Sequence, residues 1–386
     1  MNKNIKLLFS AMMVCLLVIL AACGNDTKGA GGQANEAGSD GPVKATIGVV
    51  SYLTGGGASY GEAITNGLKL ANEELKAAGE VDLELKIEDS AGKQEEALNA
   101  AQKLMNSDNV DAIIGPTLST EMFVVGPEAE LNGVTILGTS NTAEGVPQLG
   151  DYVFRNSIPE TMAIPAAVEK ALEKYDVKKV AILYGNDDVF TKAGYDVMKQ
   201  VAEDKNLEVV TTETFQLNQS DYKPLLTKIK NLEPDLILAS ALYNEGAVIL
   251  DQARKMGIDV PFVGGNGFNS PEVITIAGDA SNGLIVATPW FAQKDDEKVK
   301  NFVEKYKEAY GMEPDQFAAQ AYDGLYLIAE AVKNAGTNDR DAIRDALAEI
   351  QGFEGVLGTM SFDEDGDIVM EPTVLIIEGN EYVVFE

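Results

Sequence analysis

The chain of 386 residues has no histidine, two cysteines and a single tryptophan. Without histidine, neither a Ser-His-Asp nor a Cys-His catalytic arrangement can form, and the commonest zinc ligand is missing. Acidic residues are plentiful, but no spacing singles out a carboxylate pair suited to glycoside hydrolysis. We therefore expect a protein that is not an enzyme and that uses no metal or other cofactor. A hydrolase acting on wall or sugar polymers is the weaker alternative.

Basic residues are also few, with 30 Lys and Arg against 61 Asp and Glu and a net charge of −31. Binding of nucleic acid needs clustered Lys and Arg to displace counterions, so nucleic acid is not an expected partner. An anionic membrane surface would repel such a body. Most of the negative charge is explained by solubility.

The first 22 residues have the features of a secretory leader. Lys3 and Lys6 give a basic start, and residues 5–20 are apolar apart from Lys6 and Ser10. This stretch is shorter than the ~20 apolar residues that span a bilayer, and its length is typical of a signal-peptide core. It ends in LAACG (20–24), small residues followed by Cys23, which is the pattern of a bacterial lipobox. The alternative is a plain secretory signal with a chance cysteine.

We accordingly predict that residues 1–22 are removed and that Cys23 carries the lipid, palmitate or a similar acyl chain. Cys15 leaves with the leader, so the mature chain cannot form a disulfide between its own cysteines. Residues 23–42 contain six glycines and no large apolar residue, which predicts a flexible tether reaching roughly 25 Å. The expected location is the extracytoplasmic face of the cell membrane, held there by lipid.

From residue 44 onward, short β-branched runs alternate with amphipathic helical patterns. Strands are expected at 45–51, 83–90, 112–115, 134–137, 180–184, 208–215, 236–240, 262–264 and 283–288. Helices are expected at 60–78, 93–105, 162–175, 191–204, 222–231 and 245–256. Near the end, three helices (297–310, 317–334, 339–350) precede short strands at 359–362, 373–378 and 381–384.

Alternation of this kind predicts an α/β protein with parallel sheets covered on both faces. Eight or nine such units exceed what one open sheet usually carries, so we expect two doubly wound lobes with the ligand cleft between them. The glycine-rich loop at 53–61 has no dinucleotide or Walker motif. Its small residues can expose backbone N–H groups to an anionic ligand at a helix start, or the loop is simply flexible.

Three segments together resemble the Leu/Ile/Val-binding protein family: 51–79 (SYLTGGGASYGEAITNGLKLANEELKAAG), 112–116 (AIIGP) and 136–142 (ILGTSNT). This family comprises type I periplasmic binding proteins that serve ABC importers. The resemblance implies two lobes that close on a ligand and three passages between them, near 154–157, 288–291 and 355–362. It thus implies an N-terminal lobe of 43–155 plus 290–355 and a C-terminal lobe of 156–289 plus 356–386.

The resemblance also implies the ligand contacts. The matching positions are Tyr60, Ser119, Ser140, Thr142, Phe190, Tyr243 and Asn266. In the family, the first lobe holds the carboxylate and ammonium groups of an amino acid, which hydroxyls such as those of Ser119 and Thr142 can solvate. Each Ser or Thr is alternatively a helix N-cap, and each aromatic residue at a strand end is alternatively part of the core.

One position departs from the family pattern. Amino-acid binders usually carry Asp or Glu at the position of Asn266, where the acid pairs with the ligand's ammonium group. An uncompensated buried cation is costly. Either another acid such as Glu245 takes over, or the ligand lacks a full ammonium group, which keeps amides and other neutral polar solutes open.

The resemblance implies a monomer whose partners are a small ligand, most simply an amino acid of branched-chain type, and an ABC permease. A subunit that reports its ligand to a membrane receptor is the alternative. Two further features have plain explanations. The acidic run 363–367 is interpreted as a turn between strands, because its glycine is misplaced for an EF-hand. Trp290 is expected at the second passage between lobes, in the hinge or at the cleft mouth.

Overall fold

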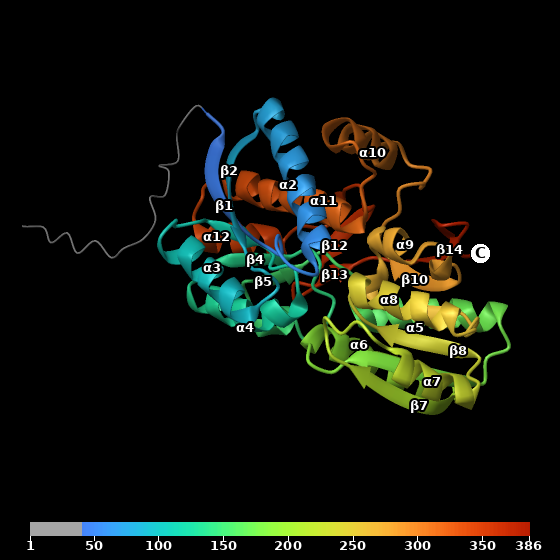
Figure 1. The fold of residues 1–386 in the computed structure, drawn as a ribbon. Helices are drawn as coiled ribbons and strands as arrows, with labels where there is room; N and C mark the ends of the chain where they lie inside the picture. Colours follow the sequence, from blue (N-terminus) through green and yellow to red (C-terminus); the bar gives the residue numbers. More distant parts are fainter. Residues whose placement is uncertain (1–40) are drawn as a thin grey trace, which may run out of the picture. The chain divides into compact units, whose positions relative to one another are not determined.

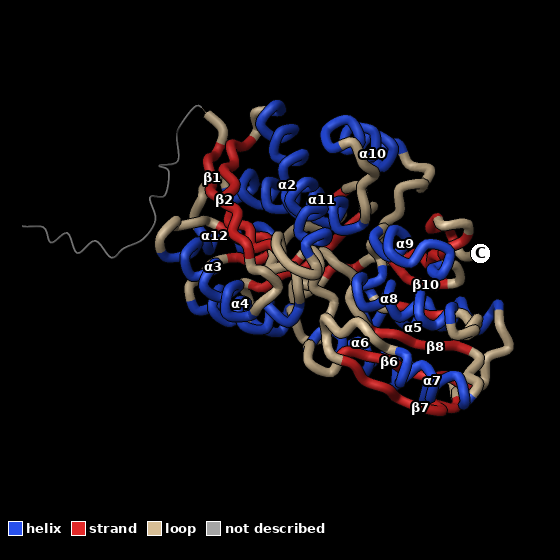
Figure 2. The backbone as a smooth tube through the Cα atoms, viewed as in Figure 1, coloured by secondary structure: helices blue, strands red, loops and turns tan. Residues whose placement is uncertain are grey.

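The computed structural model describes residues 41–386, drawn in Figures 1 and 2. Cys23, the leader and nearly all of the predicted tether lie outside the described residues. Within residues 41–386, no helix combines the length and apolar character needed to cross a membrane.

The first lobe is built on a five-stranded sheet of order β2-β1-β3-β4-β5, in which every pairing is parallel. Its strands are β1 (Val43–Ser51), β2 (Val81–Asp89), β3 (Ala112–Ile114), β4 (Thr135–Gly138) and β5 (Val153–Arg155). Its helices are α2 (Ala58–Ala78), α3 (Gln94–Asn106), α4 (Ser119–Leu131), α10 (Glu297–Tyr310), α11 (Gln316–Ala335) and α12 (Arg340–Ala348), with a 3-10 turn, η1 (Pro147–Leu149). Strands β3 and β4 are buried along their whole length, as expected for a parallel sheet covered on both faces.

The second lobe is built on a seven-stranded sheet of order β15-β14-β10-β9-β8-β6-β7. Its strands are β6 (Lys179–Gly185), β7 (Glu208–Phe215), β8 (Leu236–Ser240), β9 (Phe262–Gly264), β10 (Leu284–Thr288), β14 (Thr373–Glu378) and β15 (Glu381–Val384). Its helices are α5 (Glu160–Lys174), α6 (Val189–Asp204), α7 (Lys223–Leu232), α8 (Tyr243–Lys255) and α9 (Glu272–Ala277), with 3-10 turns η2 (Asn266–Phe268) and η3 (Gly278–Ser281).

The expected two-lobed α/β fold is confirmed, but the second sheet is not wholly parallel. Strand β14 runs antiparallel to both β10 and β15. The turn between β14 and β15 has Gly379 and Asn380 at φ 60° and 65°. Two such residues between two strands are typical of a tight hairpin, so this antiparallel pair had a local signal in the sequence.

Helix α4 and strand β5 were not among the expected elements. Helix α4 carries an apolar run, Met122 to Val125, followed by Gly126 and Pro127 in its interior. Gly and Pro usually mark the end of a helix, and α4 has no polar face with helical period. Strand β5 has only three residues, which is too short for an alternating pattern.

The third passage between lobes lies later than expected. Residues 353–369 form a small antiparallel sheet of β11 (Phe353–Glu354), β12 (Thr359–Phe362) and β13 (Ile368–Val369). The ring of Phe362 packs edge-on against Phe154 of β5, 5.4 Å between centroids. The chain joins the second sheet only at β14, so the expected boundary at 355/356 falls inside this small sheet. A sequence shows that β12 is extended, but not which strands it pairs with.

A buried ion pair joins this small sheet to the first lobe. Arg155, 3% exposed, donates to both carboxylate oxygens of Asp367, from Nε at 2.7 Å and Nη2 at 2.6 Å. Its Nη1 donates to the carbonyls of Asn141 and Ala143, at 3.3 and 2.7 Å. The acidic run 363–367 is therefore a structural turn: Asp363 Oδ1 accepts the N–H groups of Asp365 and Asp367.

We expect Asp367→Ala to lower the free energy of unfolding by about 3 kcal/mol, because it leaves the Arg155 guanidinium buried without a counter-charge. Urea unfolding followed by circular dichroism measures this loss. The matched control is Asp365→Ala in the same turn, where an exposed carboxylate receives one hydrogen bond from Gln148 and the loss should stay under about 0.5 kcal/mol. Equal losses in the two variants would contradict the proposed role of Arg155.

Candidate functional site

A small cavity lies where the two lobes meet. Its lining comes from α2, α4 and α11 and the loop after β4 in the first lobe, and from α6, η2 and the residue before α8 in the second. The lining residues are Tyr60, Thr117, Leu118, Ser119, Ser140, Phe190, Leu242, Asn266, Gly267 and Phe317. Its volume is about 20 Å³, close to that needed for one water, so the lobes are closed upon each other.

The position of the cavity follows from the topology. The loops after β3 and β4 carry Ser119 and Ser140, and the segments after β6, β8 and β9 carry Phe190, Leu242 and Asn266. Because neighbouring parallel strands end at the same edge of a sheet, these residues gather at the carboxyl edges of the two sheets. That edge is where open α/β sheets bind ligands.

Five of the seven predicted contacts line this cavity: Tyr60, Ser119, Ser140, Phe190 and Asn266. Thr142 and Tyr243 are not lining residues: the Tyr243 N–H bonds the Tyr60 hydroxyl of the wall, whereas Thr142 reaches the wall only through Glu160. The Thr142 hydroxyl lies 3.4 Å from Glu160 Oε1, and the Tyr243 ring meets the Tyr60 ring edge-on with centroids 4.8 Å apart. Neither of these two side chains is part of the wall itself, and the role of all seven residues in ligand binding stays a prediction.

The first-lobe hydroxyls lie around the start of α4. Ser119, 1% exposed, is the first residue of this helix, and its Oγ accepts the Ala143 N–H at 3.2 Å. Ser140 donates its hydroxyl to the Thr117 carbonyl at 2.6 Å. Ser119 is thus not the N-cap residue, which is Leu118. Free N–H groups at a helix start beside serine hydroxyls form a favourable site for a carboxylate.

Tyr60 joins the lobes directly. Its hydroxyl donates to the Gly267 carbonyl at 2.5 Å and accepts the Tyr243 N–H at 2.7 Å, so one oxygen from α2 satisfies two backbone groups of the second lobe. Position 267 requires glycine, because a Cβ there would lie 2.2 Å from the Ala241 carbonyl oxygen. Burial raises the pKa of Tyr60 well above its usual value, so the hydroxyl stays protonated and able to donate.

A second contact between lobes lies beside Phe190. The Thr120 hydroxyl on α4 donates to the Asp188 carboxylate, and its oxygen lies 3.2 Å from the Val189 N–H that points to it. Asp188 also caps α6, accepting the Thr191 N–H at 2.9 Å. This contact holds Phe190, 5% exposed, at the cavity wall.

The side chain of Asn266 is engaged by the protein itself. Its Oδ1 accepts a hydrogen bond from Gln316 Nε2 at 2.6 Å, and Gln316 Oε1 accepts the Thr288 hydroxyl at 2.6 Å. Gln316 begins α11 in the first lobe, so this chain of amides and hydroxyl also crosses between lobes. The Asn266 oxygen is therefore used in holding the lobes together.

Glu160 is the functional candidate that sequence reasoning missed. It begins α5, is completely buried, and accepts the Asn266 N–H on Oε1 at 2.9 Å. Its Oε2 has no hydrogen-bond partner among the described residues. Burial raises the pKa of Glu160 to about 7, an effect only partly offset by the hydrogen bonds from Asn266 and Thr142. The sequence signal for Glu160 was an acid directly after Pro159, but we expected the helix to begin two residues later, at Met162.

Glu245, expected as a substitute partner for an ammonium group, does not line the cavity. Its Oε1 accepts the Asn218 N–H at 2.8 Å, and burial raises its pKa. The glycine-rich loop is also placed differently from the expectation of an anion site. Gly55 and Gly57 pack on the ring of Tyr52, and a Cβ on Gly57 would lie 2.3 Å from that ring.

The apolar part of the wall was not predicted. It consists of Leu118, Leu242 and Phe317, which join Phe190 and the Tyr60 ring. Phe317 and Tyr60 pack with centroids 4.8 Å apart. Hydroxyls and a helix start on one side, with aliphatic and aromatic side chains on the other, suit a small molecule with one anionic and one apolar end.

Two α/β lobes, linked by three chain passages and enclosing a mixed polar and apolar cavity, define the type I class of two-lobed solute-binding proteins. A family model described as periplasmic binding protein matches residues 44–379. The chain belongs to this periplasmic binding protein family, and the resemblance to the Leu/Ile/Val-binding proteins is confirmed.

The similarity extends over nearly the whole described chain. The leucine-, isoleucine-, valine-, threonine-, and alanine-binding protein of Pseudomonas aeruginosa is 29% identical over 327 residues, which are 83% of this chain and 86% of that protein. The branched-chain amino acid transporter substrate binding protein LivJ of Streptococcus pneumoniae, solved in complex with isoleucine, is 31% identical with a TM-score of 0.83. The leucine binding protein LivK of Thermotoga maritima is 27% identical with a TM-score of 0.82. Each match to these two structures covers 88% of this chain and 97% of the other.

We expect Tyr60→Phe to shift the ligand-free protein toward separated lobes, because the Gly267 carbonyl and Tyr243 N–H lose their shared partner. The cost of closure should be about 1–3 kcal/mol. Small-angle X-ray scattering should show a larger radius of gyration. The control is Tyr310→Phe, which removes a hydroxyl bonded at 3.0 Å to the Asn66 carbonyl within the first lobe. An unchanged radius in Tyr60→Phe, or the same increase in both variants, would contradict the bridging role.

Proposed function

We propose that this protein is an extracytoplasmic solute-binding protein of an ABC importer that binds a small amino acid with an apolar side chain and catalyses no reaction. The observation that carries the proposal is the cavity at the junction of the lobes, lined by serine hydroxyls, a helix start and apolar side chains, with the buried carboxylate of Glu160 bonded to the backbone N–H of the lining residue Asn266. Two of the similar solved structures, an isoleucine complex and a leucine binding protein, support the same assignment.

Each end of an amino acid has a partner in this arrangement. The carboxylate would meet the start of α4 and the hydroxyls of Ser119 and Thr142. The ammonium group would meet Glu160, whose Oε2 is buried and without a partner among residues 41–386. Leu118, Leu242 and Phe317 would contact the apolar side chain. Glu160 thus supplies the charge that Asn266 lacks.

Binding would be coupled to movement of the lobes. The cavity volume of about 20 Å³ is too small for any amino acid, so the lobes must separate to admit one and close again around it. A permease that recognises the closed arrangement would then receive a loaded protein. The proposed permease is the membrane partner, and the binding protein acts as a monomer.

Isothermal titration against a panel of amino acids tests the proposal. Leucine, isoleucine or valine should bind, with a negative heat-capacity change because apolar surface is buried. Glutamate and lysine, whose side chains are charged, should not bind at the same concentrations. A folded protein that binds none of the apolar amino acids would overturn the amino-acid assignment.

The role of Glu160 has its own signature in pH. Its carboxyl group has a pKa of about 7, and only the ionised form above that pH attracts an ammonium group. Affinity at pH 6 should therefore be about tenfold lower than at pH 8. In Glu160→Gln, affinity should be low and nearly independent of pH, whereas Glu169→Gln, an exposed position on the same helix, should behave as the wild type. Retention of the full pH dependence in Glu160→Gln would assign it to another group, such as Glu121 in the first turn of α4, whose pKa burial also raises to about 7.

A neutral amide is the second candidate ligand, favoured by the uncharged Asn266 and Gln316 beside the cavity. It predicts binding that is insensitive to Glu160→Gln. Use of the same fold as a ligand-reporting subunit of a membrane receptor is the alternative role. The ligand titrations do not separate transport from reporting, whereas loss of solute uptake on deletion of the protein would support transport.

The lipid anchor at Cys23 is proposed on the lipobox sequence alone. Cys23→Ser should prevent acylation and release the protein from the membrane fraction into the soluble extracytoplasmic fraction. Intact-mass measurement should show a chain that begins at Cys23 with added acyl groups in the wild type and none in the variant. A wild-type protein without acyl groups would overturn the anchor and leave the proposed ligand unaffected.

A further inference from the structure

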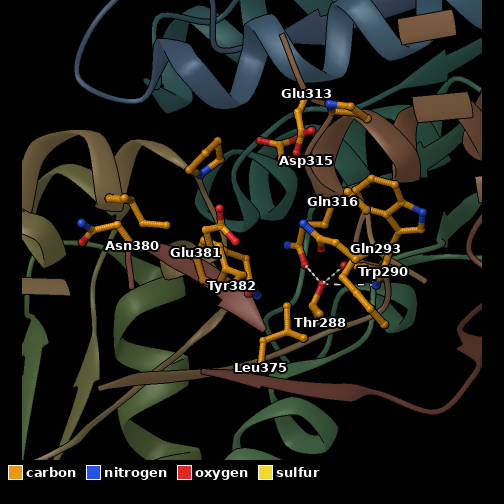
Figure 3. A pocket seen from close by; sticks show the side chains of 16 residues that line it. Thr288, Trp290, Gln293, Glu313, Asp315, Gln316, Leu375, Asn380, Glu381 and Tyr382 are labelled. Carbon is orange, nitrogen blue, oxygen red and sulfur yellow. Dashed lines mark hydrogen bonds between the residues drawn. The ribbon is translucent and has the colours of Figure 1, made fainter. Parts of the chain in front are cut away.

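A second and much larger cavity, which we call the junction cavity, has Gln316 among its lining residues (Figure 3). Its volume is about 310 Å³, within the range of small-molecule pockets. Its walls come from the segment after β10, the residues before and at the start of α11, the β14–β15 hairpin and the region around α9. The lining residues are Asn269, Pro271, Ile274, Thr288, Trp290, Phe291, Ala292, Gln293, Glu313, Pro314, Asp315, Gln316, Leu375, Asn380, Glu381 and Tyr382.

The lining combines aromatic rings with carboxylates. Three aromatic residues and three acids belong to it. They are Trp290, Phe291 and Tyr382, and Glu313, Asp315 and Glu381. No lysine or arginine of residues 41–386 is among the lining residues, but Lys307 forms an ion pair with the lining residue Glu313. Figure 3 shows the side chains of Glu313 and Asp315 near each other on one wall, Glu381 and Tyr382 on another, and Trp290 across from Glu381.

The walls are held in place by contacts within the protein. The Tyr382 hydroxyl donates to the Phe268 carbonyl at 2.6 Å, and the Trp290 ring packs edge-on against Phe302 at 5.7 Å. Asp315 caps α11 by accepting the Ala318 N–H at 3.0 Å. Burial raises the pKa of Asp315 to about 7, with backbone N–H groups giving the only opposing effect. Among residues 41–386 its carboxylate has no cationic partner, which a bound cation would provide.

We propose that the junction cavity binds a small organic cation, with its ammonium group among the rings of Trp290 and Tyr382 and the carboxylates of Glu381 and Asp315. Aromatic faces attract cations, and quaternary ammonium groups are typical ligands of aromatic cages. The absence of basic side chains from the lining disfavours an anion. A neutral ligand would leave Asp315 and Glu381 without a counter-charge, whereas Glu313 already has Lys307.

Occupancy of the junction cavity would act on the closure of the lobes. Glu313 and Gln316 belong to the first lobe, and Glu381 and Tyr382 to the second, so one occupant touches both. Gln316 and Thr288 form part of its wall and also hold Asn266 at the smaller cavity. If the proposed function holds, the cation stabilises the closed arrangement and raises affinity for the amino acid, and the amino acid raises affinity for the cation by the same factor.

Choline tests the site without any amino acid, so its outcome does not depend on the proposed function. Isothermal titration of the purified protein with choline should show binding. Its uncharged isostere, 3,3-dimethyl-1-butanol, should bind at least about tenfold more weakly, because it has the same shape without the charge. Absence of choline binding, or equal affinity for the two compounds, would overturn the proposal.

Variants place the bound cation. The double variant Asp315→Asn, Glu381→Gln should weaken choline binding about tenfold or more, since two carboxylates of the wall lose their charge while Asn can still cap α11. The matched control is Glu308→Gln, Glu378→Gln, which removes the same charge from exposed positions on α10 and β14 outside the lining. Equal weakening in both double variants would show a general charge effect and overturn the assignment, as would full retention of binding in the first.

Discussion

The closed arrangement of this protein depends on one tyrosine oxygen. The hydroxyl of Tyr60, carried by α2, satisfies the Gly267 carbonyl and the Tyr243 N–H of the other lobe at once. Inside a protein such groups are costly to bury without a partner, so lobes without this oxygen would have to separate or admit water. The Thr120–Asp188 contact and the Asn266–Gln316–Thr288 chain lie beside it. All three contacts cross between the lobes through hydrogen bonds, one of them to the Asp188 carboxylate. Such bonds can break and form again as the lobes move.

The distribution of buried charge explains how an unusual residue can occupy the position of Asn266. Its neighbour Glu160 is completely buried, and this burial raises the pKa of its carboxyl group. A cation beside the carboxylate would be favourable there. Arg155 on the first lobe is a buried basic residue. It is buried but fully paired with Asp367, and its remaining donor fixes the carbonyls of Asn141 and Ala143 next to Thr142. Asp367 balances the charge of Arg155, whereas Oε2 of Glu160 has no hydrogen-bond partner among residues 41–386.

The two cavities at the lobe junction differ in the chemistry of their lining residues. The smaller is enclosed by serine hydroxyls, a helix start and apolar side chains, and the larger by aromatic rings and carboxylates. Gln316 lines the larger cavity and reaches the smaller one through its hydrogen bond to Asn266, while its amide oxygen accepts the Thr288 hydroxyl. A single neutral side chain at the start of α11 therefore couples the geometry of two sites that suit ligands of different charge.

The amino-acid sequence by itself determined the alternation of strands and helices, because period-2 and period-3.6 patterns are local. Strands β7, β8, β9, β12, β14 and β15 begin and end at the residues expected from that pattern. The resemblance added the position of the site, and Tyr60, Ser119, Ser140, Phe190 and Asn266 do line one cavity. Tertiary structure alone decided what each of them does. The bond between Asn266 and Gln316, the bond between Glu160 and the Asn266 N–H, and the packing of Phe362 in β12 on Phe154 all depend on residues more than ten positions away. Local periodicity carries no information about such contacts, since burial and pairing are fixed only when distant segments pack together.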